Sequence, residues 1–133
     1  MKLTRVLVLV LAAAAVAAAC GGGSSDQGPR TLRFALIPKS LDIPVFDYAR
    51  IGAERAAAEL GNVEVIYRGP ESADELRQKE VLESFIQQGV DGIAISVLNA
   101  EFLTSTIDRA IEAGIPVVTW DSDAPKVSAA RTA

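Results

Sequence analysis

The chain has 133 residues, of which half are hydrophobic, and a formal net charge of −4 at neutral pH. This composition suits one globular domain with a buried core. With no histidine and a single cysteine, the sequence excludes an internal disulfide and a Cys/His zinc cluster. An acidic chain without basic clusters is a poor partner for nucleic acid, because such binding depends on neutralising phosphates. We therefore expect no nucleic-acid partner and no cofactor.

The first 19 residues have the pattern of a secretory signal peptide. Lys2 and Arg5 form a basic start, and an apolar run over residues 6–19 follows, which is short for a transmembrane helix. The run ends in "AAAC", which resembles a bacterial lipobox, so we expect Cys20 to be lipidated; an ordinary signal peptide with an incidental cysteine is the alternative. Residues 20–30 are rich in glycine and serine, as in a flexible tether. The expected location is the periplasm or the outer face of the cell membrane, with a lipid anchor.

From residue 31 onward, strand-like and helix-like segments alternate. Short apolar runs with little strict polar alternation predict strands that are buried on both faces of a parallel sheet. These runs are "LRFALI", "VEVIY", "GIAIS" and "PVVTW", at residues 32–37, 63–67, 92–96 and 116–120. The alternation predicts an α/β fold, an open three-layer sandwich with right-handed crossovers.

Three amphipathic segments lie between the predicted strands. The first has a stripe of apolar residues at helical spacing: Phe46, Ala49, Ala53, Ala56 and Leu60. The second follows a capping-box pattern from Ser72 to Glu75, and the third follows Asn99, a suitable N-cap. Each predicted helix ends at a glycine, which adopts the left-handed conformation that stops a helix: Gly61, Gly89 and Gly114.

Polar residues follow the predicted strands at the points where an open α/β sheet binds its ligands. Lys39 follows the first strand, Ser96 ends the third, and Asp121 and Asp123 follow the fourth. Carboxylates accept hydrogen bonds from hydroxyl groups and a lysine donates them. These residue types therefore predict a site for a small polyhydroxylated ligand.

Several of these residues also have a purely structural interpretation. Asp123 fits a turn before Pro125, and Phe46 fits core packing as well as stacking under the apolar face of a ligand. Arg68, after the second strand, reads as a surface residue. The nucleophile-elbow, phosphate-loop and dinucleotide-binding motifs are missing from the sequence. We therefore predict that the chain is not an enzyme.

Taken together, these stretches resemble the ribose-type periplasmic sugar-binding proteins of bacterial ABC importers. The resemblance rests on "FALIPKSLDIPVF", "GAERAAAELGNVEVIYRGP", "QQGVDGIAIS" and "AIEAGIPVVTWDSDAP", which run in the family's order over residues 31–125. "IPK" and "WDSD" are closer to the rhamnose and autoinducer-2 binding subgroup. In that subgroup the lysine and the first aspartate contact the ligand, and these positions are Lys39 and Asp121 here.

The sequence also departs from the family pattern. Ribose binders place two adjacent aromatic residues after a proline in the first loop, where this chain has Val45 and Phe46. They follow the fourth-strand aspartate with arginine, where this chain has Ser122. Family members have two similar lobes that enclose the sugar, so residues 31–133 are expected to form an incomplete, truncated N-terminal lobe.

The resemblance implies the substrate-binding lipoprotein of a carbohydrate importer. Its partners would be a small sugar or autoinducer-2-like ligand, a membrane permease, and the membrane through the lipid anchor. The alternatives are a sensory receptor for the same ligands, a sugar-acting enzyme, or a fragment with no function of its own.

Overall fold

The computed structural model describes residues 30–126 of the chain. Within this range, four strands alternate with three helices. The strands are β1 (Leu32–Ile37), β2 (Val63–Tyr67), β3 (Gly92–Ile95) and β4 (Val117–Thr119), and the helices are α2 (Val45–Leu60), α3 (Glu75–Gln88) and α4 (Ala100–Glu112). All strand pairs are parallel and the order is β2-β1-β3-β4. The predicted α/β class and parallel sheet are confirmed.

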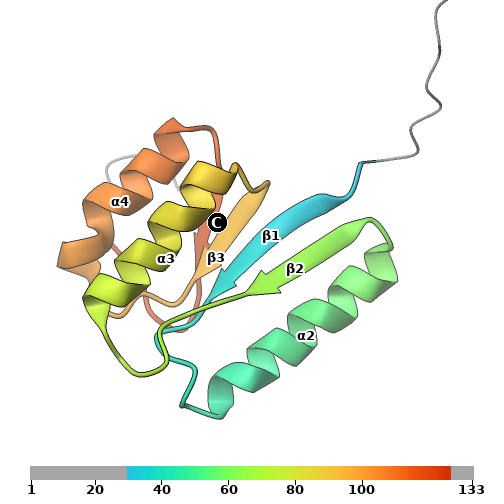
Figure 1. The fold of residues 1–133 in the computed structure, drawn as a ribbon, viewed down its shortest axis with the longest axis horizontal. Helices are drawn as coiled ribbons and strands as arrows, with labels where there is room; N and C mark the ends of the chain where they lie inside the picture. The colour runs from blue at the N-terminus through green and yellow to red at the C-terminus, as the bar shows by residue number, and fades with distance from the viewer. Residues whose placement is uncertain (1–29, 127–133) are drawn as a thin grey trace, which may run out of the picture.

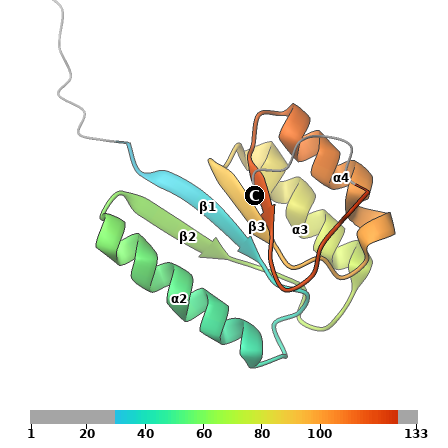
Figure 2. The ribbon, with the colours of Figure 1, turned by 180° about the vertical axis from the view of Figure 1, so that it is seen from behind.

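The strand order places the helices on two faces of the sheet. The crossover from β1 to β2 runs to one side, whereas those from β2 to β3 and from β3 to β4 run to the other. Right-handed crossovers then put α2 on one face and both α3 and α4 on the opposite face. Figures 1 and 2 both show α3 and α4 side by side, with α2 apart from them and next to β2.

The main core lies between the sheet and the pair α3 and α4. Alternate strand residues face this side, and Phe85 from α3 and Ile107 from α4 pack against them, both fully buried. The strand residues in this cluster are Ala35, Ile37, Ile93, Ile95 and Val117. Among the described residues, no helix is both long and apolar enough to cross a membrane.

The apolar stripe predicted for α2 is partly wrong. Phe46 and Ala57 are the buried residues of this helix, whereas Ala56 and Leu60 are exposed. Because α2 packs mainly against the edge strand β2, its buried face is narrow. A step of four residues from Ala53 to Ala57 keeps to that face, while the predicted step to Ala56 leaves it.

The cap predicted for the second helix is also wrong. Asp74, not Ser72, is the N-cap of α3, and its carboxylate accepts a hydrogen bond from the backbone N–H of Arg77 at 3.0 Å. Asp74 has the extended conformation that an N-cap needs. The Asn99 cap of α4 is confirmed, because its side-chain oxygen accepts a hydrogen bond from the backbone N–H of Phe102.

Candidate functional site

The candidate site lies where the strand order reverses. From β1 the chain crosses over to β2 on one side, and from β2 it returns past β1 to β3 on the other side. The loops after β1 and β3 therefore diverge at the carboxyl ends of these neighbouring strands. Ligands of open α/β folds bind at this position. Lys39 lies in the loop after β1, Ser96 directly follows β3, and Asp121 follows β4.

Asp121 is the centre of the site. Its Oδ2 atom accepts a hydrogen bond from the Ser96 hydroxyl at 2.7 Å and lies 2.9 Å from the Lys39 ammonium nitrogen. Ser96 is fully buried, whereas 43% of the Asp121 side chain and 26% of the Lys39 side chain are exposed. The structure therefore brings three of the predicted site residues together, with the ion pair at the surface and the hydroxyl beneath it.

These contacts keep the Asp121 carboxylate ionised. The hydrogen bond from Ser96, and next the one from Lys39, lower the pKa of Asp121 below its ordinary value, because both stabilise the charged form. Both contacts are made by Oδ2, so Oδ1 can accept a hydrogen bond from a ligand hydroxyl. The lysine ammonium carries three donors, so Lys39 can donate to a ligand while it stays paired.

The backbone of this loop is held in an unusual conformation. Asp121 has φ of 60°, in the left-handed region, where Asp is tolerated better than most residues. Trp120 and Ser122 on either side are bridged, and the backbone N–H of Trp120 donates to the carbonyl of Ile95 at 3.1 Å. The Ser122 hydroxyl also donates to the carbonyl of Val97. The loop after β4 is thus tied, on either side of the carboxylate, to the end of β3 and to the segment that follows it.

A buried glutamine ties the two strand ends together. The Nε2 of Gln78 on α3 donates to the carbonyls of Pro38 at 2.9 Å and Ser96 at 2.8 Å, and its Oε1 accepts the backbone N–H of Leu98 at 2.9 Å. Gln78 is fully buried. It therefore fixes the backbone on either side of the switch point, next to Lys39 and at Ser96 itself.

Two other predicted residues have mainly structural contacts. Phe46 is 5% exposed, and its ring meets that of Trp120 edge to face with centroids 5.5 Å apart, so little of its surface is open to a ligand. Asp123 Oδ1 accepts from the hydroxyl of Thr119 and from the backbone N–H of Ala124, each at 2.8 Å, which is the geometry of a turn cap. Cys20 lies outside the described residues.

The surface beside the carboxylate is a shallow hollow. It has a volume of about 190 Å³ and is lined by residues 119–123. Clefts that bind small molecules usually enclose about 300–1,000 Å³, so this hollow is smaller than a typical small-molecule cleft. Within residues 30–126, no group of three or more His, Cys, Asp or Glu residues can hold a metal ion.

Known proteins that are similar to this chain include sugar-binding proteins. The chain is 28% identical over 101 residues to the ribose import binding protein RbsB of Bacillus subtilis, a match that covers 76% of this chain and 32% of RbsB. Among solved structures, it is similar to LsrB from Clostridium saccharobutylicum in complex with AI-2, with a TM-score of 0.66, 32% identity and coverage of 69% of this chain and 28% of LsrB. The arabinose-binding protein AraP from Geobacillus stearothermophilus matches with a TM-score of 0.70, 39% identity and coverage of 76% of this chain and 34% of AraP.

These matches confirm the resemblance predicted from the sequence. The chain spans about a third of the length of the relatives it matches. Residues 34–133 match the periplasmic binding protein domain, which includes all the strands and helices described above except the first two residues of β1. The chain therefore belongs to the periplasmic binding protein domain family.

Proposed function

We propose that residues 31–133 form part of the N-terminal lobe of a sugar-binding protein that delivers its ligand to an ABC importer. The observation that carries the proposal is the group of Asp121, Lys39 and Ser96 at the switch point of the sheet. It presents an ionised acceptor and a charged donor next to each other at the surface. Adjacent hydroxyl groups of a sugar, or of a compound such as AI-2, match this pair, because one can donate to the carboxylate and the other can accept from the ammonium.

The relatives support this ligand class. Solved structures similar to this chain include a solute-binding protein from Burkholderia graminis in complex with D-arabinose and one from Agrobacterium vitis bound with alpha-D-tagatopyranose. In the proposed mechanism a second lobe closes over the sugar by hinge motion, and the closed form docks on a membrane permease. This wall alone offers few hydrogen bonds, each worth about 0.5–1.5 kcal/mol net. We therefore expect it to bind sugar with a Kd in the millimolar range.

Trp120 provides the assay for this proposal. It is the only tryptophan in the chain and directly precedes Asp121, so its fluorescence reports on ligands at the site. D-arabinose, D-ribose, tagatose and AI-2 would each be titrated into the protein, and we expect a saturable change with at least one of them. If none gives a saturable change at any accessible concentration, the proposed function is wrong.

A matched pair of variants tests the role of the carboxylate. Asp121→Asn keeps the shape and tolerates the left-handed backbone, but removes the charge, so we expect sugar affinity to fall about tenfold. Asp91→Asn is the control, because Asp91 precedes β3 at the opposite end of the sheet, where it pairs with Arg30 at 2.6 Å. The Asp91 side chain is 18% exposed and also accepts the backbone N–H of Arg33, so circular dichroism verifies the folding of this control before its sugar binding is compared. Equal loss of sugar binding in both variants would contradict the assignment of Asp121.

We also propose that the protein is exported and anchored by a lipid on Cys20. The proposal rests on the signal-like residues 1–19 and the Gly/Ser-rich residues that follow the cysteine. In a bacterial host, we expect the chain to partition into the detergent phase with the membrane, and Cys20→Ser to move it to the aqueous phase. A chain that partitions identically with and without Cys20 would refute the anchor while leaving the sugar site untested by this experiment.

A further inference from the structure

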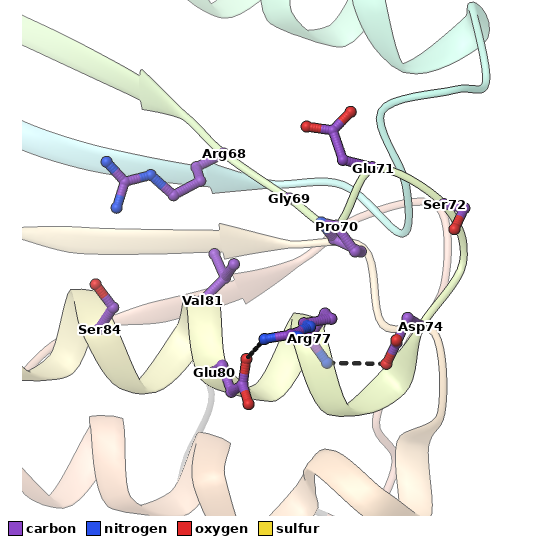
Figure 3. Close-up of a pocket in the computed structure, with 10 residues that line it drawn as sticks. All are labelled: Arg68, Gly69, Pro70, Glu71, Ser72, Asp74, Arg77, Glu80, Val81 and Ser84. Atoms are coloured by element: carbon purple, nitrogen blue, oxygen red, sulfur yellow. Dashed lines mark hydrogen bonds and ion pairs between the residues drawn. The ribbon is translucent and has the colours of Figure 1, made fainter.

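A second cavity lies away from the candidate sugar site. It has a volume of about 530 Å³ and lies between the segment that follows β2 and residues 74–84, which include the N-cap and the first ten residues of α3 (Figure 3). Neither Lys39, Ser96 nor Asp121 lines it. Its volume is within the range of small-molecule clefts, about 300–1,000 Å³.

Arg68 is the cation of this cavity that has no carboxylate partner among residues 30–126. Its guanidinium lies over the ring of Phe85, 5.5 Å from the centroid, and Phe85 is fully buried. The cavity's other arginine, Arg77, pairs with Glu80 at 2.7 Å. A guanidinium that is held against an aromatic face can still present its N–H donors at its edge.

The acidic residues of the cavity are engaged or directed elsewhere. Asp74 accepts the N–H that caps α3, and Glu80 is paired with Arg77. Figure 3 shows the Glu71 carboxylate pointing away from α3, on the side toward α2, while Arg68 extends toward the end of the cavity where Ser84 lies. An anion beside Arg68 therefore meets a guanidinium with no competing carboxylate at that end.

At the Arg68 end, the walls offer the Ser84 hydroxyl and an apolar surface. The Ser84 hydroxyl accepts a hydrogen bond from Gln88 at 2.9 Å, which leaves its own hydrogen for an acceptor in the cavity. Val81 on α3 and Pro70 after β2 line the space between the charged ends. In Figure 3 the Val81 side chain points from α3 toward the sheet, into this space.

We propose that this cavity binds a small amphipathic organic anion, with its carboxylate on Arg68 and Ser84 and its apolar body against Val81 and Pro70. An arginine fork binds a carboxylate through two parallel hydrogen bonds, which are stronger than bonds between neutral groups. This site is independent of the sugar site and of the function proposed for it. It gives the lobe a second ligand whose binding does not require the Asp121 carboxylate.

The test is a nuclear magnetic resonance titration of the whole chain with two probes of the same shape. Benzoate carries the carboxylate and benzamide is its neutral counterpart. We expect saturable shifts of the amide signals of Ser72, Val81 and Ser84 with benzoate, and affinity at least about tenfold weaker for benzamide. Arg68→Gln should remove this difference between the probes, whereas Arg55→Gln, an equal charge change at an exposed position of α2, should preserve it.

Three results would overturn the proposal. One is the absence of saturable shifts in these amides up to the solubility limit of benzoate. Another is a response centred on Asp121 and abolished by Lys39→Gln, because Lys39 is the cation of the sugar site. The third is equal affinity for benzoate and benzamide, since the carboxylate would then contribute nothing. Circular dichroism of Arg68→Gln verifies that the variant is folded, which is expected because Arg68 is exposed.

Discussion

Replacing Gln78 by leucine should destabilise the fold severely, because it removes hydrogen bonds that hold the strand ends at the switch point of the sheet. Leucine has nearly the same size as glutamine but can neither donate nor accept a hydrogen bond. The variant would leave the carbonyls of Pro38 and Ser96 and the N–H of Leu98 without the partner they have now. Since Gln78 is fully buried, water does not replace these bonds without opening the structure.

The expected loss follows from the number of groups left unpaired. A buried polar group that loses its hydrogen bond costs about 1–3 kcal/mol. The three groups around Gln78 together put the loss at about 3–9 kcal/mol, and in the lower part of that range because the Leu98 bond is only partly buried. A domain of this size has a total free energy of unfolding of about 5–15 kcal/mol, so the substitution removes a large share of it.

Urea unfolding followed by Trp120 fluorescence measures this loss. With a denaturant dependence of about 1–3 kcal/mol per molar urea, the midpoint for Gln78→Leu should fall by roughly 2 M. Gln87→Leu is the control on the same helix, because Gln87 is exposed, and it should stay within about 0.5 kcal/mol of the unmodified chain.

A third variant separates hydrogen bonding from packing. Gln78→Glu keeps an acceptor for Leu98 but turns an anionic oxygen toward the two carbonyls, so it should regain stability in acid, where the protonated carboxyl group donates one bond. If Gln78→Leu is as stable as the unmodified chain, the hydrogen bonds described here do not hold the strand ends.

Two further predictions concern the site and the sheet. Because the pKa of Asp121 is lowered in the folded chain, its contacts stabilise the fold at pH values above the unfolded pKa, and this stabilisation is lost as the pH falls through the lower, folded pKa. Ser96→Ala should raise the pKa of Asp121, which carbon-detected titration of the carboxylate measures. An unchanged pKa would contradict the role of the Ser96 hydrogen bond. Gly92→Ala should cost about 1–3 kcal/mol, because a Cβ there would lie 2.7 Å from the Phe34 ring. Gly52→Ala, in open space within α2, should instead stabilise the chain by up to about 1 kcal/mol in the same urea assay, and the reverse order of the two variants would refute the packing argument.

The elements that local sequence determines could be predicted well. The first two strands have the predicted bounds, and the last two are shorter by one or two residues. The left-handed conformations of Gly61 and Gly89 end their helices as predicted. Periodicity and glycine chemistry act over a few residues, so a single sequence contains them in full.

The parts that depend on distant contacts could be predicted only in outline. Topology alone puts Lys39 and Asp121 on one rim, since parallel strands end at the same edge. The hydrogen bond that fixes Asp121 comes from Ser96, 25 residues away. Gln78 escaped notice because it lies among polar helix residues, and its partners Pro38 and Ser96 are 40 and 18 residues away. Such a residue is recognised only after the sheet is assembled.

The left-handed backbone at Asp121 restricts how this site can change during evolution or engineering. Only glycine, asparagine and aspartate adopt this conformation at little cost, and glycine would discard the side chain. Asp121→Asn can therefore remove the charge and keep the backbone conformation, whereas the longer side chain of glutamate or the branched one of threonine would require the loop to be remodelled. New ligand preferences should arise by changing Lys39, whose backbone carries no such restriction, and by changes in the wall that faces it.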